Sequence, residues 1–72
     1  MMVEVRLDDG TGEKEGGASK LHLPDGITVG MALDAIDLPA GRVNRVEVNG
    51  VRRGLDHLLA NGDRVALYLV EG

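Results

Sequence analysis

Helical periodicity is confined to one short segment, residues 28–38, and this restriction does most to limit the possible folds. Its apolar residues recur at positions i, i+3, i+4 and i+7, so they share one helical face. They are Val29, Ala32, Leu33 and Ile36. Thr28 stands at the N-cap position, and Pro39 ends the helix because the residue before a proline is disfavoured in helical conformation. Gly30 lies in the first turn, where close packing on a sheet would explain a glycine.

The segments before the helix alternate between apolar and polar residues, as half-buried strands do. The pattern covers residues 3–7 and again residues 20–23, which end at Pro24. Between them lies a polar, glycine-rich stretch, residues 8–17, which predicts a hairpin loop.

Strand patterns also follow the helix. Residues 43–48 lead into Asn49-Gly50, a dipeptide typical of a two-residue hairpin turn, and residues 51–53 form a return strand whose brevity predicts an edge position. Residues 55–59 are too short for a stable helix and predict a single turn. Residues 64–70 are apolar enough for a central strand covered on both faces, and we expect this strand to run parallel to the first.

The element order is therefore strand, strand, helix, strand, short strand, strand. One helix can cover one face of a mixed four- or five-stranded sheet, so the order predicts an α+β roll. The sequence contains no linker or internal repeat, and we expect residues 1–72 to form one domain. Because the chain has no cysteine, its stability must come from an aliphatic core.

The composition argues against two classes of partner. Tyr68 is the only aromatic residue and the net charge is −4, which disfavours nucleic-acid binding through base stacking. No apolar run approaches the ~18 residues that suggest a membrane span. The first residues lack the pattern of a signal peptide, so we expect a cytoplasmic protein with no membrane partner.

No catalytic or metal-binding motif is evident. Ser19 is the single serine and has no obvious base as a partner, and His22 and His57 lie far apart in the sequence. The glycine-rich stretch lacks the Gly-Lys-Ser/Thr ending of a phosphate loop. We therefore predict no catalytic residue, no metal site and no bound cofactor, and a protein that is not itself an enzyme.

Basic residues gather in the second half of the chain. Residues 1–41 carry a net charge of −5, whereas residues 42–72 carry +1. The cluster consists of Arg42, Arg45, Arg52 and Arg53. It is either a solvated surface or a docking patch for an acidic partner.

Three stretches occur in an order and spacing typical of one family. They are residues 23–30 (LPDGITVG), 46–50 (VEVNG) and 55–68 (LDHLLANGDRVALY). Together they resemble the sulfur-carrier β-grasp family, which includes the thiamine-biosynthesis sulfur carrier and, closest to this sequence, the small subunit of molybdopterin synthase. The resemblance covers about two-thirds of the chain and implies a β-grasp, ubiquitin-like fold.

The resemblance also implies chemistry at the carboxyl terminus. In this family a ubiquitin-activating-type enzyme uses ATP to adenylate the terminal carboxylate. Sulfur then replaces AMP, and an acceptor such as the synthase large subunit consumes the thiocarboxylate. By this resemblance, Gly72 would be activated, while Tyr68, Leu69, Val70 and Glu71 would form the tail and partner interface. ATP would be used by the activating enzyme and not bound by this chain.

Glu71 departs from the family pattern, which ends in Gly-Gly. A carboxylate at this position would repel the phosphates of ATP. Two functions therefore stay open: a carboxyl-activated sulfur carrier or ubiquitin-like protein, and a β-grasp interaction domain with no tail chemistry. RNA binding by the arginines is a third and more distant reading.

Overall fold

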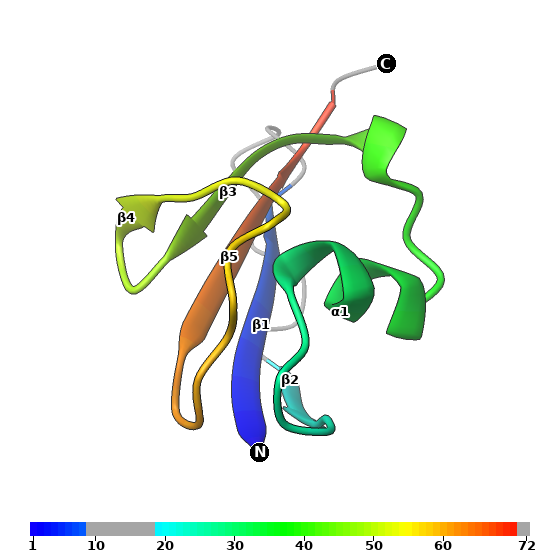
Figure 1. Ribbon diagram of the computed structural model, residues 1–72. Coiled ribbons are helices and arrows are strands. Elements are labelled where there is room, and N and C mark those ends of the chain that lie inside the picture. The colour runs from blue at the N-terminus through cyan, green and yellow to red at the C-terminus, as the bar shows by residue number, and fades with distance from the viewer. Residues whose placement is uncertain (9–18, 71–72) are drawn as a thin grey trace.

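The chain forms a five-stranded mixed sheet with one helix against one face (Figure 1). The computed structural model describes residues 1–8 and 19–70. In chain order the elements are β1 (Met2–Asp8), β2 (Ser19–His22), α1 (Val29–Ala35), the 3₁₀ turn η1 (Ala40–Arg42), β3 (Val43–Val48), β4 (Val51–Arg52) and β5 (Arg64–Leu69).

The strands lie in the order β2-β1-β5-β3-β4. This order confirms the predicted α+β roll and the edge position of the short return strand, β4. Apart from Asp8, the predicted hairpin loop of residues 8–17 lies outside the described residues.

The hydrophobic core lies between α1 and the inner face of the sheet. Every buried member is aliphatic, and the set comprises Val3, Val5, Ile27, Val29, Ala32, Leu33, Val46, Val48, Leu59, Val65 and Leu67. No polar side chain is buried in the part of the chain that the structure describes. Removal of this apolar surface from water is therefore the main source of stability.

The amino-terminal end of α1 is capped as predicted. The Oγ1 of Thr28 accepts a hydrogen bond from the backbone N–H of Met31 at 3.3 Å. This bond satisfies one of the free N–H groups of the first turn. The helix has seven residues, and no helix within residues 1–8 and 19–70 is long and apolar enough to cross a membrane.

The helix ends well before Pro39, where the sequence had predicted the stop. Asp37 adopts a left-handed conformation, with φ 57°, and reverses the backbone. The Leu38 N–H donates to the Leu33 carbonyl at 3.0 Å, and the Asp37 N–H donates to the Asp34 carbonyl at 3.1 Å. These two bonds form a Schellman motif, which most often carries glycine at the left-handed position. An aspartate there gives little sequence signal.

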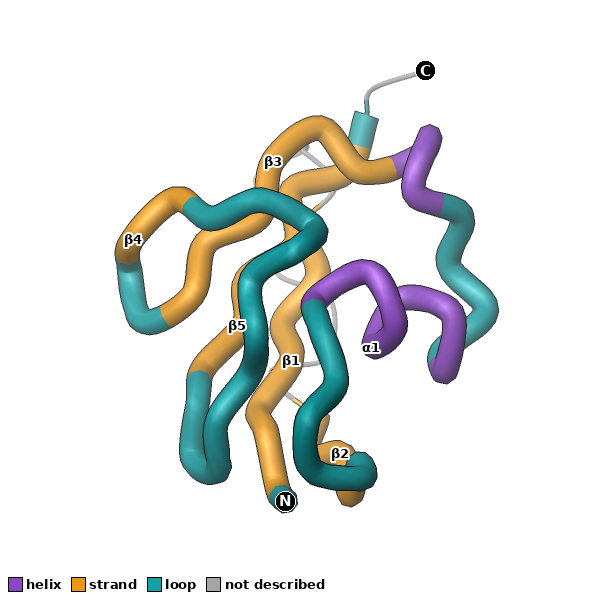
Figure 2. The backbone as a smooth tube through the Cα atoms, viewed as in Figure 1, coloured by secondary structure: helices purple, strands orange, loops and turns teal. Residues whose placement is uncertain are grey.

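Gly30 was expected to pack closely against the sheet. It packs instead against the loop between β4 and β5. A Cβ at Gly30 would lie 3.4 Å from the carbonyl oxygen of Leu55. The Gly30 N–H donates to that same oxygen at 2.9 Å, and the Val29 N–H donates to the His57 carbonyl at 2.9 Å. Figure 2 shows this loop and α1 on the same side of the sheet. The loop therefore forms part of the layer that covers the inner face.

The last strand lies at the centre of the sheet, as predicted. β5 pairs in parallel with β1 and antiparallel with β3. The prediction that both of its faces are covered is wrong. Val65 and Leu67 are buried, but Ala66 and Tyr68 are half-buried and Arg64 is exposed. Arg64, Ala66 and Tyr68 occupy alternate positions, so they share the face that points away from α1.

The Asn49-Gly50 turn is tied to the loop before β5. Both residues have positive φ, 54° and 82°, as a type I′ hairpin turn requires. The Asn49 Oδ1 accepts from the Arg64 N–H at 3.0 Å, while its Nδ2 donates to the Asp63 Oδ1 at 3.0 Å. The other carboxylate oxygen of Asp63 accepts from the Ala60 N–H at 2.8 Å. Asp63 thus links two loops at one end of the sheet.

Replacing Asp63 with alanine is expected to lower the free energy of unfolding by about 1 kcal/mol, because two donors lose their acceptor at a site that water can reach. Urea denaturation followed by circular dichroism measures the effect. Asp34→Ala is the matched control, since this exposed carboxylate on α1 has no hydrogen bond within the described residues. Equal midpoints for the two variants would contradict the linking role of Asp63.

Candidate functional site

The sheet face that points away from α1 carries charged and polar side chains in place of a hydrophobic layer. Strand register arranges these side chains in rows. Arg6 of β1, Ala66 of β5 and Glu47 of β3 form one row, and Tyr68 lies beside Arg45 in the next. We define the outer sheet face by its central residues, which are Glu4, Arg6, Arg45, Glu47, Arg64, Ala66 and Tyr68.

Tyr68 is held on this face by two residues of β3. The guanidinium carbon of Arg45 lies 4.2 Å from the centre of the tyrosine ring, a cation–π contact. The Tyr68 hydroxyl donates to the Glu47 Oε1 at 3.5 Å, and the Arg45 Nε lies 3.4 Å from the Glu47 Oε2. Each member of this cluster contacts the other two, so the three side chains restrain one another.

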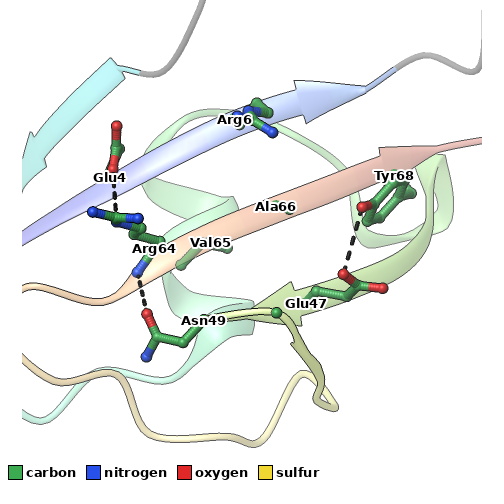
Figure 3. Close-up of a pocket in the computed structure, with 9 residues that line it drawn as sticks. Glu4, Arg6, Glu47, Asn49, Arg64, Val65, Ala66 and Tyr68 are labelled. Carbon is green, nitrogen blue, oxygen red and sulfur yellow. Dashed lines mark hydrogen bonds and ion pairs between the residues drawn. The ribbon is translucent and has the colours of Figure 1, made fainter. Parts of the chain in front are cut away.

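A shallow depression of about 660 Å³ lies on the outer sheet face beside this cluster (Figure 3). Its lining includes Ala66, whose methyl group is much shorter than the side chains of Arg6 and Glu47 on either side. At one end, the Arg64 Nε lies 3.5 Å from the Glu4 Oε2. Arg6 has no ion pair among residues 1–8 and 19–70. The depression therefore has one arginine that is paired and one that is not.

Leu69 and Val70 were predicted both in the last strand and in the tail, and the structure places Leu69 in the strand. Leu69 is the last residue of β5 and pairs with Val43 of β3, so it belongs to the sheet. The Val70 N–H donates to the Arg42 carbonyl at 2.8 Å, and Val70 itself is 52% exposed. Glu71 and Gly72 lie outside the described residues. Activation of Gly72 and a partner interface formed by residues 68–71 remain predictions.

The four arginines predicted as a docking patch lie on η1, β3 and β4 and directly after β4. Arg45, Arg52 and Arg53 line a second depression of about 330 Å³ at the β3–β4 edge of the sheet. Arg42 lies in η1, outside that lining. The sheet also has a register irregularity between Val43 and Arg45, and such bulges and charges discourage pairing with other chains at a sheet edge. Docking by these four arginines remains a prediction.

The candidate catalytic and metal-ligating side chains that the structure describes do not form a cluster. No group of three or more His, Cys, Asp or Glu side chains within residues 1–8 and 19–70 could hold a metal ion. Ser19 and His22 lie at opposite ends of β2, while His57 lies in the loop that packs against α1. These residues are not brought together.

Five members of the outer sheet face were not identified from the sequence, namely Glu4, Arg6, Glu47, Arg64 and Ala66. The signal was the alternation within residues 64–68, in which Arg64, Ala66 and Tyr68 fall at every second position. Reading the last strand as buried on both faces concealed this pattern. The residues of β1 and β3 that lie beside β5 could then not be recognised as members of one surface.

Two solved structures are similar to this chain over its full length. The crystal structure of SAMP1 from Haloferax volcanii has a TM-score of 0.73 at 26% sequence identity, covering 100% of this chain and 99% of that one. A ubiquitin-like protein from Caldiarchaeum subterraneum has a TM-score of 0.58 at 20% identity, with the same coverage. The chain has the ubiquitin-like β-grasp fold. Neither a family model nor the sequence of a curated protein matches it.

The β-grasp assignment confirms the fold that the sequence resemblance implied. The likeness is to ubiquitin-like proteins in general, which is a broader group than the sulfur carriers. Small ubiquitin-like proteins serve as modifiers or carriers and generally work with activating enzymes.

Proposed function

We propose that this β-grasp protein is a carrier whose carboxyl-terminal glycine, Gly72, is activated by a ubiquitin-activating-type enzyme. The observation that supports the proposal is the place of β5 in a ubiquitin-like fold. β5 lies between β1 and β3 at the centre of the sheet, and the chain continues directly from it toward Gly72. A rigid central strand would present the following residues at a fixed point on the domain, where a partner enzyme could receive them.

The proposed chemistry needs no catalytic side chain from the carrier. An oxygen of the Gly72 carboxylate attacks the α-phosphorus of ATP, and pyrophosphate leaves, giving an acyl adenylate. A hydrosulfide-equivalent donor supplied by the partner then attacks the carbonyl carbon, and AMP leaves with the acyl-bound oxygen. The product is a thiocarboxylate. A terminal glycine suits this reaction, because it has no Cβ to clash in a narrow enzyme channel.

The residues nearest this terminus would form part of the partner interface. Tyr68 lies on the outer sheet face and Val70 is half exposed, so both are accessible beside the end of β5. The acceptor would be a sulfur-consuming enzyme, such as a synthase large subunit in a molybdopterin-like pathway, and the protein would work in the cytoplasm. The carrier itself would bind no cofactor.

Mass spectrometry tests the proposal directly. The native polypeptide is incubated with the activating enzyme of the same organism, ATP and a sulfide donor. We expect its mass to rise by the difference between one sulfur and one oxygen atom, and to do so only when ATP is present. An unchanged mass, under conditions in which the enzyme hydrolyses ATP to AMP and pyrophosphate with another carrier, would contradict the proposal.

One observation favours a second function, an interaction domain without tail chemistry. Glu71 places a carboxylate beside the terminus, where it would oppose the approach of ATP phosphates. In that case the exposed side chains around Val70, or the arginines, would dock a partner without any covalent step. Shortening the tail separates the two functions, because only the carrier requires Gly72.

A further inference from the structure

Positive charge is concentrated on the outer sheet face of an acidic protein. Among the strand residues that the structure describes, five basic and three acidic residues point to this side of the sheet by strand register. The basic residues are Arg6, Lys20, Arg45, Arg52 and Arg64, and the acidic residues are Glu4, Asp8 and Glu47. This face therefore carries a net charge of +2, whereas the whole chain carries −4. Such a separation of charge orients an approaching charged partner.

The helix side of the domain has the opposite character. Asp34 lies on α1, Asp37 follows it, and both are exposed. Asp25 and Asp56 are exposed in the loops before and beside the helix. An acidic partner would consequently be repelled by the helix side and attracted to the outer sheet face.

Of the two arginines that line the depression, Arg6 is the one available to a ligand. Arg64 is engaged by Glu4, and Arg45 by Tyr68 and Glu47, whereas Arg6 is exposed and has no ion pair among the described residues. Its direct neighbour on β5 is Ala66, and both residues line the open space of the depression. A carboxylate entering from outside could occupy that space.

The Tyr68 cluster forms a second, preorganised contact at the edge of the depression. Tyrosine and arginine are the residue types, with tryptophan, that contribute most often to binding energy at protein interfaces. Because Arg45 and Glu47 already hold the tyrosine in place, little side-chain entropy remains to be lost on binding.

We propose that the outer sheet face docks an acidic surface of a partner protein, with a partner carboxylate entering the depression over Ala66 and binding Arg6. The partner's remaining contacts fall on Tyr68 and Arg45. This interaction does not depend on activation of Gly72, and it applies equally to a carrier and to an interaction domain.

The pattern of charges favours a protein partner over a nucleic acid. Glu4, Asp8 and Glu47 lie between the basic residues, so a phosphate backbone of uniform negative charge would meet repulsion along the sheet. The ring of Tyr68 already has Arg45 over it, which leaves this aromatic poorly placed for stacking on bases. A protein surface can offer acidic groups to Arg6 and basic or neutral groups to the carboxylates.

An NMR titration of the ¹⁵N-labelled full chain tests the proposal, with a glutamate-rich helical peptide as the probe and a lysine-rich peptide of equal length as its counterpart. We expect the glutamate-rich peptide to shift the signals of Arg6, Ala66 and Tyr68, and the lysine-rich peptide to leave them in place. Arg6→Glu is expected to weaken binding of the glutamate-rich peptide by about 10-fold or more. Ala66→Met, which fills the depression without changing charge, is also expected to weaken it.

Arg42→Glu is the matched control, because it makes the same change of charge outside the outer sheet face. Equal weakening by Arg42→Glu and Arg6→Glu would overturn the proposal, since only net charge would then matter. So would failure of the glutamate-rich peptide to bind, or signal shifts confined to α1 or to the β3–β4 edge. Tighter binding of a single-stranded RNA oligonucleotide at the same salt concentration would assign the face to nucleic acid. A dimer in sedimentation that Arg6→Glu dissociates would assign it to a second copy of the chain.

Discussion

Replacing Leu67 with alanine is expected to remove a large part of the domain's free energy of unfolding. Leu67 is 1% exposed and lies on the central strand, where its side chain belongs to the core under α1. Leucine-to-alanine changes at such sites lower the free energy of unfolding by roughly 2–5 kcal/mol. At about 0.05–0.15 kcal/mol per residue, a chain of this size has only about 4–11 kcal/mol in total. Urea denaturation followed by circular dichroism measures the loss.

Leu58→Ala is the control for this prediction. Leu58 is 61% exposed, so its truncation is expected to change the free energy of unfolding by no more than about 0.5 kcal/mol. Similar losses for the two variants would show that burial under α1 is not what makes Leu67 important. Comparing the two variants also tests whether the core lies only between α1 and the inner face of the sheet, because both residues are leucines and differ mainly in their exposure.

The elements of this fold were predictable where periodicity and local chemistry agree. Thr28 could be assigned as an N-cap because a threonine precedes an apolar pattern with helical spacing, and Asn49-Gly50 could be assigned as a turn because both positions need positive φ. The end of α1 was not predictable in the same way. Asp37 adopts the left-handed conformation that more often marks a glycine, and this depends on bonds to carbonyls of the preceding turn.

The candidate site was less predictable, because it depends on register. Nothing in the local sequence indicates that Arg6 lies beside Ala66 or that Tyr68 lies beside Arg45, since the pairs are formed by strands distant in the chain. The arginines grouped by sequence position comprise Arg42 on η1 and three arginines that line the depression at the β3–β4 edge. The alternation within β5 was visible in the sequence, and it identifies the face of the sheet on which each residue lies. The neighbours of a residue on that face can be identified only from the order of the strands.

The same register fixes where the sheet stops and the tail begins. Leu69 was predicted both in the last strand, residues 64–70, and in the tail; its pairing with Val43 places it in the strand. The last backbone bond described at this end joins the Val70 N–H to the Arg42 carbonyl at 2.8 Å. If the protein is a carrier, the residues available to an activating enzyme therefore start after Val70. The number of these residues then decides whether the terminal carboxylate can reach ATP in the enzyme.

Removing Glu71 and Gly72 is expected to abolish thiocarboxylate formation and to leave the urea midpoint unchanged. The new terminal carboxylate would belong to Val70, which is β-branched and hydrogen-bonded beside β5, so it could not enter a narrow channel. Every residue of the hydrophobic core lies before Val70, so the core is untouched. Glu71→Gly is the matched variant: it keeps the length, removes a charge that repels ATP phosphates, and should be activated at least as fast as the native chain. If the shortened chain keeps full biological activity while Arg6→Glu loses it, the carrier function is wrong and the protein acts by docking alone.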